Sequence, residues 1–327
     1  MARADLLIRL IQNGLLGDRT RLRKVVESII AEERSKGHTV LAEKLEGLLQ
    51  TPTSEPPRSN GPLMVNHQVE NLVREVVPQR KMEDLVLPST IQQITRDLVN
   101  EHHRRDLLRS FNLEPRNRVL LLGPPGNGKT SLAEAVAEAM MLPFFVVRYD
   151  SVVGTYLGET ANRLRHLIDY ASTRNCVLFF DEFETLGKER GDTHETGEIK
   201  RVVSSLLMQI DALPSYVIVI GATNHPELLD RAAWRRFQIR LELPQPTQAR
   251  LAAWFDAFSK RIDRPLGYAS STLAKRLAGA SFAEAEEFGM TVFRQYVLEQ
   301  PDAKMKNIVT RALKQWPARS AKTKQKP

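Results

Sequence analysis

The feature that most constrains this chain is the stretch 123–130, which reads Gly-Pro-Pro-Gly-Asn-Gly-Lys-Thr. It fits G-x-x-x-x-G-K-[ST], a loop whose backbone N–H groups hold the phosphates of a nucleotide. Glycine lets such a backbone adopt positive φ and approach an anion with no Cβ in the way. Lys129 is expected to contact the β- and γ-phosphates, and the Thr130 hydroxyl to bind Mg²⁺. The alternative is a glycine-rich turn that carries a lysine by chance.

The flanking sequence favours the phosphate-binding loop. Residues 118–122, Arg-Val-Leu-Leu-Leu, predict a short buried strand that runs into it. Residues 131–141, rich in Ala, Glu and Leu, predict a helix that leaves it, with its positive N-terminus facing the phosphates. The predicted nucleotide-binding residues are the loop and the residue after it: Gly123, Pro124, Pro125, Gly126, Asn127, Gly128, Lys129, Thr130 and Ser131.

Composition excludes several classes of protein. With 42% hydrophobic and 26% charged residues, the chain of 327 residues is typical of a globular protein with a sizeable core. No apolar run approaches the roughly 18 to 20 residues that cross a bilayer, and the N-terminus lacks the apolar segment of a signal peptide. The single cysteine, Cys176, excludes an internal disulfide framework and indicates a reducing compartment. We therefore expect a cytoplasmic protein with no membrane contact, and a Cys176 that lies in the core.

The net charge of +8 belongs almost entirely to the C-terminal end. Residues 301–327 contain eight Lys or Arg residues and one Asp, which gives +7 of the +8. We interpret this end as a solubilising, disordered tail. The alternative is a segment that contacts nucleic acid or an acidic partner.

The pattern of apolar residues divides the chain into five parts. Residues 1–50 carry three apolar stripes at helical spacing and predict a helical N-terminal module, and 51–62, with four prolines, is a linker. In 63–245 strands alternate with helices, which predicts an α/β domain with a parallel sheet covered on both faces. Residues 246–300 are wholly helical and predict a small second domain, followed by the basic tail 301–327.

Polar residues follow two of the predicted strands at their carboxyl ends, where parallel sheets bind ligands. Asp181 and Glu182 come directly after an apolar run that ends at Phe180. Asp181 is expected to hold Mg²⁺, through water, and Glu182 to polarise the water that attacks the γ-phosphate. Asn224 ends the next strand and could contact both that water and the γ-phosphate. The alternative for Asp181 and Glu182 is that the two carboxylates cap the next helix. The alternative for Asn224 is that it is a turn residue before Pro226.

Taken together, these motifs resemble those of the AAA+ ATPases, and within them the AAA group of protein remodellers. Residues 123–130 look like the Walker A motif, 177–182 like Walker B and 221–224 like sensor 1. The resemblance covers roughly residues 80–300. It implies ATP hydrolysis with Mg²⁺, a P-loop NTPase domain and a small helical lid, here 246–300. Residues 280–284 lack the sensor 2 arginine of many AAA+ proteins, which agrees with the remodeller subgroup.

The resemblance also implies assembly. In that family subunits form a ring, usually of six, and arginine fingers reach the γ-phosphate of the neighbouring subunit. Arg235 and Arg236 match the fingers, and planar guanidinium groups suit phosphate oxygens. The sequence departs from the family here, because the spacer between the two arginines is missing and Gln238 stands where an acid is common. The alternative is a solvent-facing arginine pair. The catalytic set on this basis is Lys129, Glu182, Asn224, Arg235 and Arg236.

Tyr156, Leu157 and Gly158 resemble the family's first pore loop, which grips an extended polypeptide in the channel of the ring. An aromatic and an aliphatic side chain on a mobile loop offer apolar contact that tolerates many sequences. The alternative is a tyrosine packed in the core. The polar segment 188–196 is either a second pore loop or a surface loop.

The function expected on these grounds is that of an ATP-driven ring that remodels or unfolds protein substrates. A separate protease is a possible partner, since the chain is similar to bacterial ATPases paired with a subtilisin-like peptidase. One alternative is a nucleic-acid-directed AAA+ ATPase of the loader or transposition-helper type. Another is a nucleotide-dependent switch that threads nothing.

Overall fold

The computed structural model describes residues 71–152, 157–184, 205–229 and 231–323, together with residues 26, 28–31 and 34. The chain divides into two compact units, 1–65 and 66–327. In the first unit the described residues are helical, and Ile29 and Ile30 are buried. The remaining helices expected in 1–50 and the linker 51–62 lie outside the described residues. Among the described helices, none is long and apolar enough to cross a membrane.

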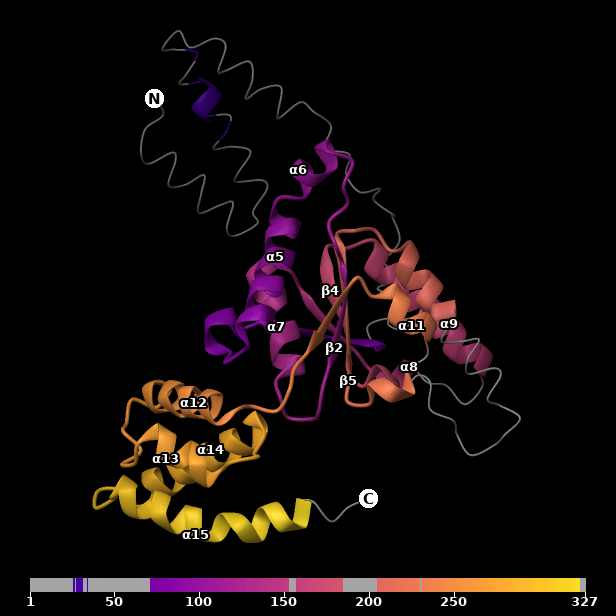
Figure 1. Ribbon diagram of the computed structural model, residues 1–327. Coiled ribbons are helices and arrows are strands. Elements are labelled where there is room, and N and C mark those ends of the chain that lie inside the picture. The colour runs from indigo at the N-terminus through magenta and orange to yellow at the C-terminus, as the bar shows by residue number, and fades with distance from the viewer. Residues whose placement is uncertain are drawn as a thin grey trace. The chain divides into compact units, whose positions relative to one another are not determined.

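A six-stranded sheet with the order β1-β3-β4-β5-β2-β6 forms the centre of the second unit (Figure 1). Neighbouring strands are parallel except β1, which pairs antiparallel with β3 at one edge. The expected α/β fold with a largely parallel sheet is therefore confirmed. The strands are β1 (Val73–Val76), β2 (Arg118–Leu122), β3 (Phe144–Val147), β4 (Cys176–Phe180), β5 (Val217–Thr223) and β6 (Ile239–Glu242).

Each central strand is buried on both faces, because side chains alternate across the sheet. In β4, Val177 and Phe179 pack into one core, and Leu178 and Phe180 into the other. The first core is covered by α5 (Ser89–His103) and α7 (Lys129–Met140), and the second by α9 (Leu157–Ser172) and a helix at 205–212. Figure 1 shows α5 and α7 on one side of the sheet and α9 on the other. The carboxyl ends of β2, β4 and β5 are thereby held at one edge.

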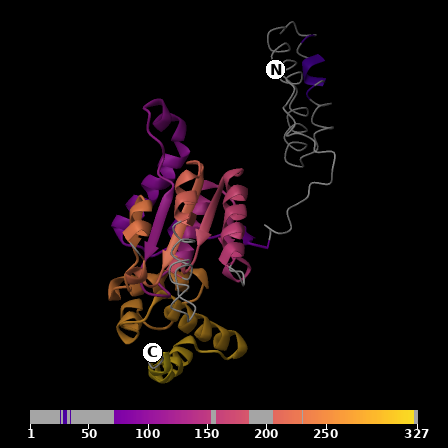
Figure 2. The ribbon, with the colours of Figure 1, turned by 90° about the vertical axis from the view of Figure 1, so that its right-hand side faces the viewer.

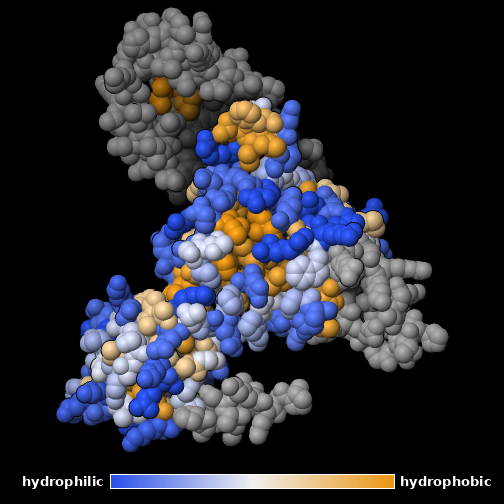
Figure 3. Space-filling view, viewed as in Figure 1, coloured by the Kyte–Doolittle hydropathy of each residue, from blue (hydrophilic) through white to orange (hydrophobic). Residues whose placement is uncertain are grey.

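Short elements connect these layers: η1 (Met82–Asp84), α6 (Arg105–Ser110), α8 (Tyr149–Val152), η3 (Pro226–Leu228) and α11 (Arg231–Arg236). One of them carries an exposed apolar surface. Leu107, Phe111 and Leu113, on and just after α6, are exposed, with Phe111 72% accessible. Figure 3 shows the corresponding hydrophobic patch over α6. Contiguous exposed apolar side chains of this kind mark interaction surfaces.

The C-terminal helices form a bundle with a core of its own, visible in orange and yellow in Figures 1 and 2. The bundle comprises α12 (Gln248–Arg261), α13 (Ser270–Arg276), α14 (Phe282–Leu298) and α15 (Met305–Thr323). Phe255, Phe258 and Phe288 lie in its core. Ser281 caps α14 in a capping box with Glu284, in which each side chain accepts the other residue's backbone N–H.

The basic C-terminal end is not the disordered tail that charge alone suggested. Residues 305–323 form α15, and Met305, Ile308, Val309 and Ala312 are buried in the bundle core. Their spacing is that of one helical face, so a stripe of apolar residues lies inside the basic segment. Among the described side chains of α15, those of Lys306 and Lys314 are exposed.

Candidate nucleotide-binding site

The predicted phosphate-binding loop lies between β2 and α7, as the motif requires. Gly123 has φ of 130°, and a Cβ there would lie 2.3 Å from the carbonyl oxygen of Leu243. This close approach follows from β6, because the N–H of Leu243 donates to the carbonyl of Leu122 at 2.7 Å. No side chain fits at this position. Glycine is therefore the one residue type that fits at position 123, where the loop begins beside the end of β6.

The Lys129 side chain connects the loop to the end of β5. Its ammonium donates to the carbonyl oxygens of Gly123 and Pro124, at 2.7 and 3.0 Å, and to Oδ1 of Asn224 at 2.6 Å. Burial lowers the pKa of Lys129, and the negative charges of Asp181 and Glu184 oppose that shift. The structure thus brings together Lys129 and Asn224, two of the residues that the sequence predicted to act together.

Thr130 and Asp181, the two residues predicted to bind a metal ion, are adjacent. The Thr130 hydroxyl donates to Oδ2 of Asp181 at 3.0 Å, and Oδ1 of the same carboxylate accepts the backbone N–H of Glu182 at 3.0 Å. A hydroxyl and a carboxylate are the oxygen ligands that Mg²⁺ prefers, so these residues fit the ion. Glu182 is exposed and has φ of +45°, a conformation that is strained for a residue with a side chain.

Glu184 lies at the candidate site and was missed by the sequence reasoning. It is buried, with 4% of its surface accessible, and its Oε1 accepts the backbone N–H of Asn224 at 3.3 Å. Its Oε2 has no hydrogen-bond partner among the described residues. This buried carboxylate holds the end of β5, the strand next to β4, and is therefore positioned to orient Asn224. Its position two residues after Glu182, in the acidic segment that follows β4, is the sequence feature that could have identified it.

Tyr149 was also missed. It lies two residues after the end of β3. Its hydroxyl is buried without a partner among the described residues, although the residue as a whole is half-buried. Burial, followed by the charges of Asp181, Glu184 and Glu182, raises its pKa well above the ordinary value. The hydroxyl is therefore protonated and close to these carboxylates. Its signal was the same as that of Asp181, a polar residue at the end of a parallel strand.

The remaining loop residues occupy different environments. Asn127 is buried, with 3% of its surface accessible, and neither of its amide atoms has a partner among the described residues. An unpaired buried amide inside a phosphate-binding loop fits a site that binds a polar ligand. Pro125 is exposed, and Ser131 is half-buried in the first turn of α7.

The two arginines of the predicted finger segment have different surroundings. Arg236 forms an ion pair with Asp211, which is also paired with Arg118. Arg235 is exposed and forms no ion pair with another described residue. Gln238, the residue that replaces an acid of the family pattern, accepts the backbone N–H groups of Asn117 and Arg118 at 2.9 and 3.1 Å. Its amide thus anchors the start of β2.

The C-terminal bundle contacts the phosphate-binding loop directly. The backbone N–H of Ala283, in the first turn of α14, donates to the carbonyl of Gly126 at 2.9 Å. A Cβ on Gly126 would lie 2.8 Å from Oγ of Ser281 and 3.0 Å from Cβ of Ala283. Short side chains at 281 and 283 therefore allow the end of α14 to lie against the loop.

Other predicted residues are not placed at this edge. Tyr156 and the segment 188–196 lie outside the described residues, and Leu157 and Gly158 begin α9.

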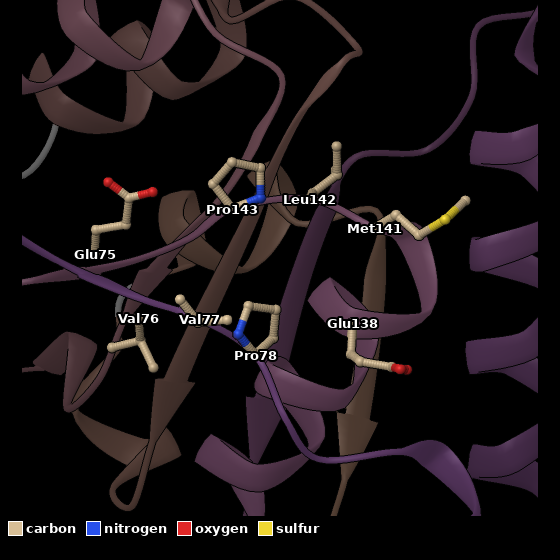
Figure 4. A pocket seen from close by; sticks show the side chains of 8 residues that line it. All are labelled: Glu75, Val76, Val77, Pro78, Glu138, Met141, Leu142 and Pro143. Atoms are coloured by element: carbon tan, nitrogen blue, oxygen red, sulfur yellow. The ribbon is translucent and has the colours of Figure 1, made fainter. Parts of the chain in front are cut away.

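A cavity of about 320 Å³ lies elsewhere, where β1 ends and β3 begins. Figure 4 shows its mostly apolar lining, which includes Val77, Pro78, Leu142 and Pro143 and none of the predicted site residues.

Comparison with known proteins agrees with this geometry. Residues 119–245 match the family model described as ATPase family associated with various cellular activities (AAA). The chain is 34% identical over 317 residues to the uncharacterized AAA family ATPase y4kL of Sinorhizobium fredii, covering 96% of this chain and 95% of the relative. It is 34% identical over 192 residues to the peroxisomal ATPase pex6 of Schizosaccharomyces pombe, covering 54% of this chain and 20% of the relative.

A third relative is the cell division cycle protein 48 homolog of Archaeoglobus fulgidus, which is 32% identical over 238 residues, or 69% of this chain and 32% of the relative. The match to y4kL thus extends along nearly the whole of both chains. The matches to the pex6 and cell division cycle proteins cover a third or less of those longer chains.

Proposed function

Because the chain belongs to the AAA family of ATPases and hydrolyses ATP, we propose that it is a protein remodeller whose subunits assemble into a ring, with six as the expected number. Similarity to pex6 and to the cell division cycle protein 48 homolog supports the protein-remodelling subgroup. The proposed substrate is a polypeptide, which the ring would unfold by pulling it through a central pore.

The contacts at the carboxyl ends of β2, β4 and β5 support roles for the predicted residues that lie there. The loop amides and Lys129 would bind the phosphates, with Asn224 holding the ammonium in place at 2.6 Å. Thr130 and Asp181, 3.0 Å apart, would hold Mg²⁺, which when bound offsets phosphate charge. Glu182, exposed at the surface of the site, would orient and polarise the attacking water. Positioning and charge stabilisation of this kind account for most of phosphoryl-transfer catalysis.

The observation that carries the ring proposal is the difference between Arg235 and Arg236. Asp211 holds Arg236 within its own subunit, whereas Arg235 is exposed and unpaired among the described residues. We assign Arg235 as the finger that acts on the nucleotide of a neighbouring subunit, and Arg236 as a residue that fixes α11. The exposed apolar patch of Leu107, Phe111 and Leu113 is a surface that assembly would cover.

Mixing two inactive variants tests this assignment. Lys129→Ala removes the phosphate contact, and Arg235→Ala removes the finger. An interface that pairs an intact nucleotide site with an intact neighbouring finger forms only in mixed rings, so mixing should restore part of the ATP turnover. Absence of recovery at every ratio, with mixed assemblies demonstrated by mass, would contradict action between subunits. The matched control is the Arg236→Ala variant, which takes the place of Arg235→Ala in the mixture. This variant should retain ATP turnover on its own.

The pore loop is the second part of the proposal. Tyr156, with Leu157 and Gly158, would contact the polypeptide, and α9 would transmit its position to the ATPase domain. Tyr156→Ala should abolish unfolding of a tagged substrate while basal ATP turnover persists. Substrates captured by a Glu182→Gln variant, which should bind ATP without hydrolysing it, would identify the natural polypeptide and any separate protease that receives it.

Among the described residues, the exposed lysines of α15 are what supports the nucleic-acid alternative. Deleting residues 301–327 would not test it, because Met305, Ile308 and Val309 belong to the bundle core. Reversing the charge of Lys306 and Lys314, both exposed, preserves that core. If this double variant loses a salt-dependent affinity for nucleic acid together with its activity, the alternative replaces the polypeptide proposal.

A further inference from the structure

Two buried polar atoms without partners lie at the ends of neighbouring strands. The Tyr149 hydroxyl belongs to the first residue of α8, just beyond β3, and Oε2 of Glu184 belongs to the segment just beyond β4. β3 and β4 are parallel and adjacent, with Phe145 beside Leu178. Their carboxyl ends therefore meet at the same edge of the sheet. Neither atom bonds to any other residue that the structure describes.

The two groups are chemically complementary. A tyrosine hydroxyl donates one hydrogen bond, and a carboxylate oxygen only accepts. Leaving either buried and unpaired costs free energy, so a contact between them is favoured over both remaining apart. The negative charge of Glu184 is among those that act on the hydroxyl and keep it protonated. A direct hydrogen bond or one bridging water would satisfy both atoms.

We propose that Tyr149 is a positioning residue of the ATPase site, whose hydroxyl donates a hydrogen bond to Oε2 of Glu184. Oε1 of the same carboxylate accepts the backbone N–H of Asn224 at 3.3 Å, and Oδ1 of Asn224 accepts from Lys129 at 2.6 Å. Tyr149 is thus the outer end of a chain of contacts that fixes the amide of Asn224. The role rests on the ATPase activity and not on the ring or the pore.

The expected signature separates turnover from binding. The phosphate-binding amides belong to residues 123–130 and make no contact with Tyr149 that the structure records. Lys129 keeps its contacts with the carbonyl oxygens of Gly123 and Pro124 when Asn224 moves, so nucleotide affinity should depend little on the hydroxyl. The position of Asn224 should depend on it, and a displaced catalytic group can lower the rate by up to about a hundredfold. Removing the hydroxyl should therefore lower kcat with little effect on KM.

The test is Tyr149→Phe, which keeps the ring that packs on the core and removes the hydroxyl alone. We expect kcat for ATP to fall about tenfold, with KM and nucleotide affinity within about twofold of the parent protein. Tyr216→Phe is the matched control, because the Tyr216 hydroxyl donates to the carbonyl of Ser172 at 2.6 Å, at the opposite end of the sheet. It should lower the melting temperature and leave kcat unchanged. An unchanged kcat in Tyr149→Phe would overturn the proposal.

A second measurement needs no catalysis. The melting temperature of the nucleotide-free protein is compared among Tyr149→Phe, Glu184→Gln and the double variant. A bond to a charged acceptor is stronger than one to a neutral amide, so loss of the hydroxyl should lower the melting temperature less when Gln replaces Glu184. If the two effects simply add, Tyr149 does not bond to Glu184 and the proposal fails, even if kcat has fallen.

Discussion

Three glycines of the phosphate-binding loop all have positive φ but differ in what surrounds them. Gly128, with φ of 87°, has no protein atom within 4 Å of where a Cβ would lie. At Gly126, with φ of 76°, the Cβ would lie 2.8 Å from Oγ of Ser281. At Gly123, with φ of 130°, it would lie 2.3 Å from the backbone oxygen of Leu243. Substitution by alanine should therefore have graded effects on stability.

The sizes of these effects follow from the geometry. Gly128→Ala adds only the strain of a left-handed residue, about 1 kcal/mol. Gly126→Ala adds the displacement of Ser281, whose N-cap contributes about another 1 kcal/mol, for a total of about 2 kcal/mol. Gly123→Ala meets a backbone atom that cannot rotate away, in a φ range open only to glycine, and should cost more than about 4 kcal/mol or prevent folding.

The assay is urea unfolding of the nucleotide-free protein, followed by far-UV circular dichroism. The free energies of unfolding should fall in the order Gly128→Ala, Gly126→Ala, Gly123→Ala. Equal values for the first two would mean that α14 does not lie against the loop. A stable Gly123→Ala protein would refute the contact with β6. A Gly126→Ala/Ser281→Ala double variant is a useful control, because it removes the clashing hydroxyl and should cost less than the sum of the single changes.

The remaining predictions concern charge and the thiol. Arg236→Ala should lower the free energy of unfolding by at most about 1 kcal/mol, because its ion pair with Asp211 is partly exposed and Asp211 keeps its ion pair with Arg118. Arg235→Ala should leave stability unchanged and lower kcat by roughly 10³-fold. Burial raises the pKa of Cys176 to about 12, so a thiol reagent at neutral pH should label it only as the chain unfolds. The unfolded thiol loses its proton at lower pH than the folded one, so stability should fall as the pH rises from about 9 toward 12, and Cys176→Ala should reduce that fall.

The part of the fold that sequence predicted well is the central sheet, where the strands are continuous apolar runs. Apolar runs such as 118–122 and 176–180 correspond to β2 and β4, since strands buried on both faces have near-continuous apolar sequence. Motif spacing also predicted that Lys129, Asp181 and Asn224 lie at one edge of the sheet. There Lys129 donates a hydrogen bond to Asn224, and Thr130 of the loop donates one to Asp181. Their catalytic roles remain predictions.

The features that sequence did not reveal depend on tertiary contacts. The adjacent Arg235 and Arg236 are chemically identical, and they differ only because Asp211, far away in the chain, reaches one of them. The segment 301–327 was assigned by its charge, although the apolar stripe Met305, Ile308, Val309 and Ala312 packs the first half of α15 into the bundle core. Gln238 looked like a departure from a pattern, and only the structure shows that it satisfies the backbone of β2.

Half of the unpartnered buried side-chain atoms in the described part of the chain lie at the nucleotide-binding edge, and that distribution is itself evidence for function. Eight buried side-chain atoms among the described residues lack a hydrogen-bond partner, and four of them belong to Asn127, Tyr149 and Glu184. Each such atom costs on the order of 1–3 kcal/mol, and the strained backbone of Glu182 adds to this. The packing of the central strands β4 and β5, which are buried along their whole length, does not require these costs at one end. A polar ligand that satisfies Asn127, and a hydrogen bond between Tyr149 and Glu184, would offset them, so nucleotide should stabilise this edge more than any other part of the domain.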